Sequence, residues 1–535
     1  MGRHRLGVCQ PALPVRDVLR RIGVGGTGPP VPQLRLGEGP LHGAALPGRD
    51  PWSPSGRGGP VTAAEPVGVL DTGFRTALSR LDRAGLLARV SRTVDFDLEA
   101  AATMKHHDAG ASLLFENVKD HDTPVVGNVF ATPESSEAAM GLDRDRLRAA
   151  LARGIRTDIE PAAASNAPAQ QNVWRSGEID LGAQLPVLKH APGDGGRFVT
   201  AGVLIVRDPL TGVRNASFHR LQLIGPDTVA VKIDHGRHLG RALDHAVEMG
   251  QDLPVAVCIG TDVALIYAAS TMGALMPESR DELCAAGGCR GAPLPVAPGV
   301  SQDIDVPADT EIVLEGVIRA GASVTEGPFG EFVGYASPAG PAPTMHVTAV
   351  TARDEPVYHA INGAGRETIV LRKHVLEVAA LEAVRPVTQI VSDVCMPPGG
   401  LHRFHLVMAL SKRYERDNGM GRNAALAAFG ALKDLNMIVL VDDDIDLHDP
   451  DDVAYALATR FDAASDLVVL PGMRGHEYVR TSRAGVGTKA ILDASVPFES
   501  RADFERIPFA APSGGELDAA YSGTTVLSWL GGEHA

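Results

Sequence analysis

The sequence predicts an α+β protein in which a central barrel-like sheet domain lies between an N-terminal α/β segment and a C-terminal α/β domain. Residues 185–350 consist mostly of strand-like runs with few helices. The last third instead alternates strand-like and helix-like runs. In addition, a chain of 535 residues is too long for one hydrophobic core, so two or three domains are expected.

The first segment of the chain differs from the rest in composition. Residues 1–65 are rich in glycine and proline and bury too little apolar surface to offset the entropy of ordering, so we interpret them as a disordered leader. GVGGTG at 23–28 fits a dinucleotide-binding glycine pattern, but prolines follow where a helix should open, and we reject that interpretation. The ordered domains are then expected at residues 66–165, 166–350 and 351–535.

The N-terminal domain opens with a predicted helix. In DTGFRTALSRLDRAGLLARV, apolar residues recur at near-helical spacing after a candidate N-cap at Asp71 or Thr72. Two strand-like runs and a further helix follow before the middle of the chain.

The elements of the middle and C-terminal domains follow from local patterns. Two apolar runs flank the turn at 209–212 and predict a β-hairpin. A helix over 237–250 and a buried strand over 253–260 come next. In the last third, a helix over 376–384 precedes several strands, and the strand in MIVLVDDDID leads into an acidic loop.

Composition excludes several classes of function. The formal net charge of -15 argues against nucleic acid as a partner, because phosphate binding needs a cationic face. No uninterrupted apolar run reaches the roughly 18 residues of an integral membrane segment. The five cysteines are scattered and odd in number, which indicates a reducing cytoplasm and buried thiols rather than disulfides or zinc.

One group of candidate metal ligands lies in the middle domain. RNASFHR and the following VKIDHGRHLGRALDH place Asn215, His235, His238 and His245 within a short stretch. An amide oxygen, a neutral imidazole and a carboxylate would suit a hard divalent ion such as Mn²⁺ or Mg²⁺. The same residues could instead be exposed helix-start histidines and a turn asparagine, and spacing alone leaves both readings open.

Two acidic segments have good structural explanations. Glu278 and Glu282 lie at a predicted helix start, where the backbone dipole favours acids. The run at 442–446 could bind a metal, as in a metal-dependent hydrolase. However, Asp449 followed by Pro450 reads as an N-cap with proline at the first helical position, which favours a structural role for this region.

The stretch TEGPFGEFVGY places two acids, Glu326 and Glu331, on either side of a rigid turn. Close carboxylates repel, so one of them tends to keep its proton near neutral pH unless a cation lies beside it. A protonated carboxyl group is what a general acid requires. Arg220 is the candidate cation. The alternative is an exposed loop with two solvated acids.

Taken together, these motifs resemble those of the UbiD-like decarboxylases, which use prenylated FMN. EGPFGE resembles the family signature, and its neighbours occur in the family order: DPLTGVRNASFHR, the histidine-bearing helix start, LPVAVCIG, the acidic helix start, VPADTEIVLEG and, far downstream, VLVDDDID. The resemblance extends from about residue 70 to about residue 500.

The resemblance implies a metal site and a flavin site. Asn215, His238 and Glu282 would hold Mn²⁺ (or Mg²⁺) and, through it, the cofactor phosphate, with K⁺ nearby. His235 is the alternative to His238. Because the segment reads PESRDE and lacks the usual glycine, Glu278 competes with Glu282.

The resemblance also implies catalytic residues. Arg220 would pair with Glu326, and Glu331 would be the proton donor after CO₂ departs. Arg422 in GMGR matches a basic residue that contacts the cofactor phosphate, although the histidine usual in that stretch is missing.

The implied activity is reversible, non-oxidative decarboxylation of an aromatic, heteroaromatic or α,β-unsaturated carboxylic acid through a covalent prenyl-FMN adduct. The implied fold is a split-β-barrel-like flavin-binding domain with a C-terminal oligomerisation domain, giving a homodimer or a multiple of dimers. A flavin prenyltransferase would supply the cofactor. A flavin- or metal-binding subunit without independent decarboxylase activity is the alternative.

Overall fold

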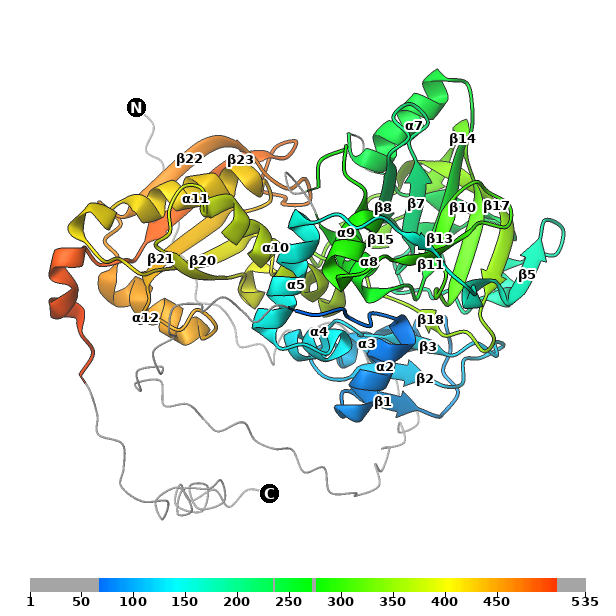
Figure 1. Ribbon diagram of the computed structural model, residues 1–535, viewed down its shortest axis with the longest axis horizontal. Coiled ribbons are helices and arrows are strands. Elements are labelled where there is room, and N and C mark those ends of the chain that lie inside the picture. The colour runs from blue at the N-terminus through cyan, green and yellow to red at the C-terminus, as the bar shows by residue number, and fades with distance from the viewer. Residues whose placement is uncertain (1–66, 234–235, 272–275, 508–535) are drawn as a thin grey trace, which may run out of the picture. The chain divides into compact units, whose positions relative to one another are not determined.

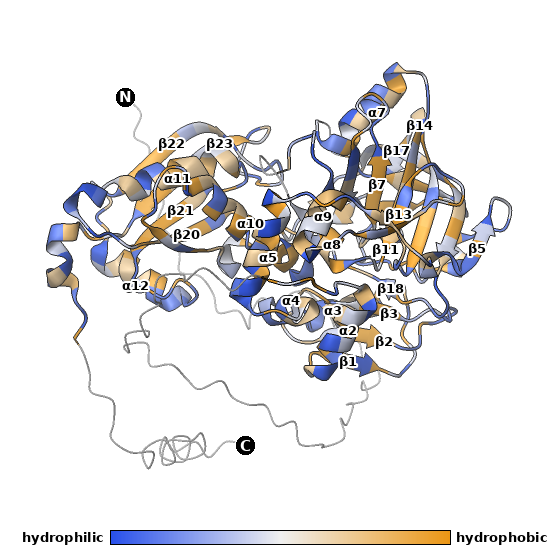
Figure 2. Cartoon of the chain, in the orientation of Figure 1, coloured by the Kyte–Doolittle hydropathy of each residue, from blue (hydrophilic) through white to orange (hydrophobic). Residues whose placement is uncertain are grey.

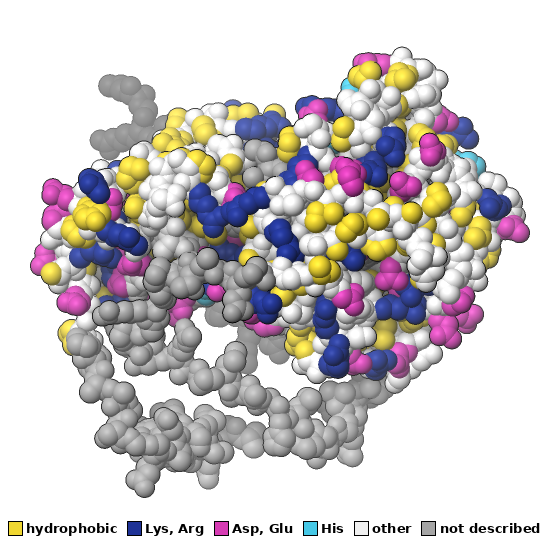
Figure 3. Space-filling view, viewed as in Figure 1, with side chains coloured by type: hydrophobic (Ala, Val, Ile, Leu, Met, Phe, Trp, Pro, Cys, Tyr) yellow, Lys and Arg dark blue, Asp and Glu magenta, His cyan; other side chains and the backbone are white. Residues whose placement is uncertain are grey.

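A computed structural model describes residues 67–233, 236–271 and 276–507 (Figure 1). The proposed leader at 1–65 and His235 therefore lie outside the described residues. Within the described part of the chain, no helix is both long and apolar enough to cross a bilayer. Figure 3 shows acidic and basic side chains interspersed over the visible face of these residues.

The N-terminal layer is a small sheet with four helices. Strands β1, β2, β3 and β18 form the sheet in that order: Leu87–Val90, Ser112–Phe115, Val125–Gly127 and Tyr358–His359. The helices of this part of the chain are α2 to α5: Phe74–Arg83, Glu99–His106, Pro133–Met140 and Arg144–Arg156. Strand β18 pairs in parallel with β3, so the chain returns to this layer after it has formed the central sheet.

The N-cap of α2 differs from the sequence expectation. The cap is Gly73 rather than Asp71 or Thr72. The carboxylate of Asp71 accepts hydrogen bonds from Gly73 N at 3.2 Å and from the Thr76 hydroxyl at 2.9 Å. The Thr72 hydroxyl donates to Asp262 at 2.7 Å. Asp71 therefore stabilises a turn and Thr72 binds a distant residue, so neither caps the helix, which begins after Gly73.

The central domain is built on a nine-stranded sheet in the order β6-β9-β10-β17-β14-β11-β7-β8, with β5 added beside β17. All neighbouring strands of this sheet pair antiparallel. The bounds of β5 to β11 are Asn172–Arg175, Phe198–Val199, Val203–Arg207, Arg214–Phe218, Leu221–Leu223, Thr228–Val231 and Leu253–Ile259. The long strands β14 and β17 are Ile312–Glu326 and Gly340–Ala352. The predicted hairpin is confirmed, because β7 pairs with β8 around the expected turn.

Both faces of the central sheet are buried, which explains its nearly continuous apolar runs. In β7, Leu204 and Val206 join one hydrophobic core, whereas Val203 and Ile205 join another. Successive side chains of a strand point to opposite faces, so the two cores lie on the two sides of the sheet. Figure 2 shows β7 and β11 in hydrophobic colours.

Short helices and minor strands complete the central domain. Helices α6 to α9 are Leu181–Gln184, His238–Glu248, Val263–Ser270 and Glu282–Arg290, and η1 is Pro168–Gln170. The predicted helix and buried strand correspond to α7 and β11, and both are confirmed. Minor strands β4, β12, β13, β15 and β16 are Ala162–Ala163, Pro295–Pro298, Asp305–Pro307, Phe329–Gly330 and Ala336–Ser337.

The C-terminal domain is a five-stranded sheet in the order β19-β20-β21-β23-β22. The strands β19 to β23 are Val391–Cys395, His405–Leu410, Met437–Asp442, Leu467–Arg474 and Val486–Asp493. Helices α10 to α12 are Arg366–Val384, Met420–Ala431 and Pro450–Arg460, and η3 to η5 are Pro398–Gly400, Glu415–Asp417 and Phe498–Phe504. Helices α10 and α11 share a core with one face of the sheet and α12 with the other. Asp449 caps α12 and Pro450 is its first residue, as predicted.

Candidate active site

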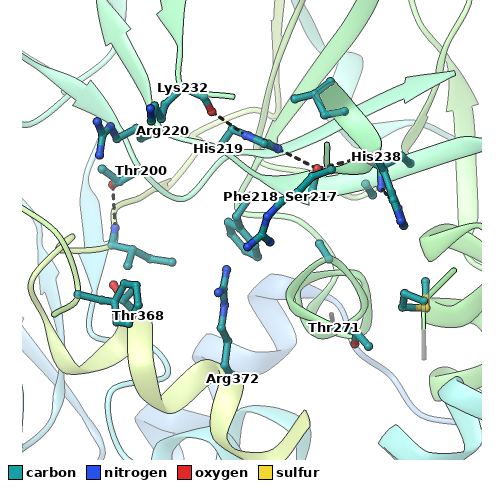
Figure 4. Close-up of a pocket in the computed structure, with 18 of the residues that line it drawn as sticks. Thr200, Ser217, Phe218, His219, Arg220, Lys232, His238, Thr271, Thr368 and Arg372 are labelled. Atoms are coloured by element: carbon teal, nitrogen blue, oxygen red, sulfur yellow. Dashed lines mark hydrogen bonds between the residues drawn. The ribbon is translucent and has the colours of Figure 1, made fainter. Parts of the chain in front are cut away.

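A cavity of about 410 Å³ collects residues from distant parts of the sequence. Its walls come from β8 and the β8–β9 connection, the starts of α7 and α9, the turn after β14, helix α10 and the C-terminal domain. Figure 4 shows part of this lining. Six of the residues that the sequence analysis singled out line it: Asn215, Arg220, His238, Glu278, Glu282 and Glu331.

Arg220 lies between the two acids of the EGPFGE turn. Its Nε and Nη2 donate to the two carboxylate oxygens of Glu326 at 2.7 and 2.9 Å. Its Nη1 donates to Glu331. Burial alone would lower the pKa of Arg220, but the hydrogen bond to Glu326 and the charge of Glu331 raise it above the usual arginine value. The guanidinium therefore stays charged and holds both carboxylates in place.

The two acids differ in their access to the cavity. The side chain of Glu326 is only 2% exposed and does not line the cavity, whereas that of Glu331 is 13% exposed and does. Glu326 is thus a buried partner of the arginine, and Glu331 is the acid of the pair that a ligand can reach.

The turn between these acids is fixed by backbone hydrogen bonds. Gly327 has a φ of 84°, in the left-handed region that favours glycine. Its N–H donates to the Gln222 side chain at 2.8 Å, and Gly330 N–H donates to Asp194 at 3.0 Å. The turn is therefore tied to two other segments, which sets the separation of the two carboxylates.

A second group, the Asn–His–Glu trio (Asn215, His238 and Glu282), converges at another part of the cavity. Asn215 lies in β8, and His238 and Glu282 are the first residues of α7 and α9. Asn215 Nδ2 lies 3.0 Å from Glu282 Oε1 and 3.4 Å from His238 Nδ1. His238 Nδ1 lies 3.8 Å from Glu282 Oε1. The backbone N–H of Ala216 donates to the second oxygen of Glu282 at 2.9 Å, which fixes that carboxylate.

The trio fits a hard divalent cation. Burial raises the pKa of Glu282, although the hydrogen bond from His238 opposes this, and a bound cation would favour the ionised form. A half-turn of the Asn215 amide would present its oxygen to the same point. Within the described ranges, no cluster of three or more His, Cys, Asp and Glu side chains is arranged to hold a metal ion. The trio contains two such residues and an amide.

The structure separates the competing ligand candidates. Glu278 lines the cavity but pairs with Arg241, so Glu282 is the glutamate that contacts Asn215. His245 pairs with Asp208 at 2.9 Å and does not join the trio. His235 falls outside the described residues, so only His238 is placed.

Arg422 is not brought to the cavity. Helix α11 directs its guanidinium to Asp493, at 2.7 Å, and to Asp466, at 3.5 Å. The expected contact of Arg422 with a cofactor phosphate stays a prediction that this placement does not support, because the acids beside β22 and β23 hold its side chain away from the cavity.

The acidic run at 442–446 has basic partners within the protein. Asp443 pairs with Arg501 at 2.6 Å and Asp444 with Arg460 at 2.6 Å. Asp442 is buried, accepts from a backbone N–H and lies 3.3 Å from Lys412 Nζ. The geometry therefore supports the structural interpretation of this run rather than a hydrolytic metal site.

The sequence analysis did not identify one further wall of the cavity, which contains Arg403, Phe332 and His476 and is called the far wall below. Arg403 lies 4.7 Å from the ring centroid of Phe332, and the His476 ring lies 5.3 Å from the same ring. Burial, helped by the charge of Arg403, lowers the pKa of His476 to about 3. Further residues on this wall are Arg372, Lys433 and Tyr478. No local motif marks Arg372, Lys433 or Tyr478, because they come from separate segments of the C-terminal domain.

Comparison with known proteins agrees with this fold and site. Three models of 3-octaprenyl-4-hydroxybenzoate carboxy-lyase domains match the chain: the N-terminal domain at residues 78–154, the Rift-related domain at 161–366 and the C-terminal domain at 370–494. The chain is thus an enzyme of the carboxy-lyase class. It belongs to the UbiD family.

Two curated relatives are decarboxylases. The chain is 34% identical over 435 residues to anhydromevalonate phosphate decarboxylase of Methanothermobacter thermautotrophicus, covering 81% of this chain and 99% of that protein. It is 29% identical over 425 residues to gallate decarboxylase of Lactiplantibacillus plantarum, covering 75% of this chain and 87% of that protein.

A solved structure shows the same fold. The UbiD-class enzyme HmfF from Pelotomaculum thermopropionicum, in complex with FMN, matches with a TM-score of 0.79 and 36% identity, covering 83% of this chain and 99% of that chain. An evolved dimeric form of HmfF in complex with prFMN matches with a TM-score of 0.74 and 34% identity, covering 84% of this chain and 98% of that chain.

Proposed function

We propose that this chain is a prenylated-FMN-dependent decarboxylase of an aromatic, heteroaromatic or α,β-unsaturated carboxylic acid. The observation that carries the proposal is the position of Arg220, bound by the buried Glu326 on one side and by the cavity-lining Glu331 on the other. The trio at another part of the same cavity supplies the means to hold a flavin phosphate through a cation.

The chemistry explains why a cofactor is needed. Loss of CO₂ from an sp² carbon would leave an unstabilised carbanion. Prenylated FMN, when bound, supplies the covalent electron sink that this carbon requires. The complexes of HmfF with FMN and prFMN support the choice of flavin.

The trio is proposed as the metal site. Asn215, His238 and Glu282 would bind Mn²⁺ or Mg²⁺, with K⁺ nearby, and the cation would bind the flavin phosphate. The distances of 3.0 to 3.8 Å among their polar atoms support this, because they allow one ion to reach all three side chains.

Arg220 and Glu331 have complementary roles in the proposal. The charged guanidinium of Arg220 orients the substrate carboxylate beside the flavin. Glu331 then gives its proton to the carbon that has lost CO₂, so that R–COO⁻ and H⁺ become R–H and CO₂. Glu326 keeps Arg220 in place as a positioning residue. The reverse reaction, carboxylation, uses the same groups in the opposite order.

Domain roles are also proposals. We assign residues 66–165, 166–350 and 351–535 to N-terminal, flavin-binding and C-terminal domains, and the last of these to oligomerisation. Support for a dimer comes from the evolved dimeric form of HmfF.

The decisive experiment is co-expression with a flavin prenyltransferase, followed by the absorbance spectrum and mass of the bound cofactor. The purified protein is then incubated with a panel of unsaturated acids, and product and CO₂ are measured. Bound prenylated FMN and release of CO₂ from at least one acid are expected. A protein that binds the cofactor and converts no acid would favour a subunit that needs a partner.

A further inference from the structure

One wall of the cavity, unlike the far wall, is built from a single short stretch of sequence. Residues 215–220, NASFHR, all line the cavity, and the first four of them belong to β8. In the proposed function, Asn215 binds the cation and Arg220 orients the substrate. Ser217 and His219 lie between them and have no assigned role. Because they follow Asn215 at alternate positions, they continue the same face of the strand.

The side chains on this face form a continuous row of hydrogen bonds. His219 Nδ1 lies 2.8 Å from the backbone oxygen of Lys232, and His219 Nε2 lies 3.0 Å from Ser217 Oγ. Ser217 Oγ lies 3.1 Å from Asn215 Oδ1, and Asn215 Nδ2 lies 3.0 Å from Glu282 Oε1. Figure 4 shows the part of the row from Lys232 through His219 to Ser217. The row thus connects a backbone carbonyl group to the Asn–His–Glu trio.

The backbone oxygen of Lys232 fixes the direction of these hydrogen bonds. A carbonyl oxygen can only accept, so His219 Nδ1 carries the hydrogen and donates to it. In a neutral imidazole the other nitrogen, Nε2, then accepts, and the Ser217 hydroxyl is the donor that faces it. A hydroxyl has one hydrogen, so Ser217 is left with acceptor capacity for the Asn215 amide. The NH₂ group is the half of that amide that donates, and it should therefore face Ser217.

An Asn215 amide in that orientation presents its carbonyl oxygen to the rest of the trio. The oxygen and nitrogen of an amide exchange places when the group turns over, so Oδ1 takes the position 3.0 Å from Glu282 Oε1 and 3.4 Å from His238 Nδ1. An amide oxygen and a carboxylate oxygen repel each other at this distance, and a cation between them removes the repulsion. The direction of the row therefore favours the cation-bound form of the trio.

We propose that His219 is a positioning residue of the cation site, which turns the carbonyl oxygen of Asn215 towards the cation by way of Ser217. This inference rests on the proposed function, because the trio is a metal site only as part of that function. His219 does not touch the ion itself. Loss of a group that orients a metal ligand in this way typically weakens metal binding by about 10- to 100-fold.

The test measures binding of Mn²⁺ to the full-length protein, free of metal and flavin, from the electron paramagnetic resonance signal of the unbound ion. His219→Phe keeps a ring and removes both nitrogens. His219→Gln keeps the direction of the row, because its amide can donate to the Lys232 carbonyl and accept from Ser217. The control is His346→Phe, because His346 lies on β17 beside Asp227 and does not line the cavity.

His219→Phe should weaken Mn²⁺ binding by about 10- to 100-fold. The Ser217 hydroxyl then lacks its acceptor and donates to Asn215 Oδ1 instead, which holds the amide nitrogen towards the cation site. His219→Gln should keep most of the wild-type affinity, and His346→Phe should keep all of it.

A second substitution distinguishes positioning from packing. When His219→Phe is combined with Ser217→Ala, the misdirected donor is removed and the Asn215 amide can turn its oxygen to the ion. The double variant should therefore bind Mn²⁺ about fivefold more tightly than His219→Phe, the scale of one hydrogen bond. If His219 acted only by filling space, the removal of a second side chain could not restore binding.

Each of three results would overturn the inference: an affinity for Mn²⁺ that survives His219→Phe, a double variant that binds no better than His219→Phe alone, or a wild type that binds no Mn²⁺. Binding in the expected order by a protein that decarboxylates no acid would overturn the proposed function alone. Decarboxylation by a protein whose Mn²⁺ affinity does not depend on His219 would overturn this inference alone.

Discussion

We expect Glu331→Gln to lower turnover strongly and to leave the structure of the site nearly unchanged. The amide of glutamine keeps the shape of the side chain and can still accept from Arg220 Nη1. The two hydrogen bonds from Arg220 to Glu326, at 2.7 and 2.9 Å, are untouched. We therefore expect a loss of stability on the order of 1 kcal/mol, the size of one hydrogen bond, and unchanged flavin binding. Turnover should fall by roughly 10² to 10⁴, because the amide has no proton to give to the carbon.

The matched variant is Glu326→Gln. The Glu326 carboxylate is buried and makes the two-point contact with Arg220, so loss of its charge should lower the unfolding free energy by about 3 kcal/mol. This is the low end for breaking a buried ion pair, because Glu331 still contacts the arginine. Urea unfolding, flavin content and CO₂ release are measured for both variants. Turnover of Glu331→Gln within tenfold of wild type at equal flavin content would refute its role as proton donor. Equal stability losses in the two variants would refute the difference in burial on which the argument depends.

Three further predictions follow from the structure. Glu282→Ala should lower metal content by elemental analysis and reduce flavin retention, whereas Asp443→Asn should leave both unchanged; the opposite pattern would favour the hydrolase hypothesis. Arg422→Gln should lower stability by about 1 kcal/mol through loss of its contact with Asp493 and leave flavin affinity unchanged; weaker flavin binding would restore its phosphate role. Burial lowers the pKa of His374 to about 3. Its contribution to the unfolding free energy is therefore fully present above pH 6.5 and is lost as the pH falls towards 3, because only the unfolded state binds the proton in that range. The unfolding free energy should therefore drop by up to about 1.4 kcal/mol per pH unit in this window, and His374→Phe should flatten that slope in urea titrations between pH 6 and 4.

The parts of the fold that sequence predicts well are those set by local patterns. Helix α7 follows from apolar spacing, and the β7–β8 hairpin follows from two apolar runs around a proline–glycine turn. The predicted N-cap of α2 was wrong, because Thr72 binds Asp262, a residue 190 positions away that no local pattern reveals.

The residues of the site also differ in how well the sequence predicts them. Arg220 is 106 residues from Glu326 and 111 from Glu331, and only the order of motifs brought them together in the sequence analysis. Arg372 and His476 carry no motif, and a single arginine on a helix face is indistinguishable from a solvated one until the opposite wall is known. Arg422 was assigned from an incomplete motif; in the structure the acids around it hold its side chain, and its contact with a cofactor phosphate stays a prediction.

The placement of one cation between two acids explains why the motif contains both. Glu326 binds Arg220 through two nitrogens and neutralises it without reaching the cavity. A substrate carboxylate that arrives beside Arg220 would therefore meet a guanidinium whose charge is already matched by Glu326, with Glu331 as the acid that it can contact. In the proposed reaction, Glu331 is then the acid placed to give a proton to the carbon that loses CO₂.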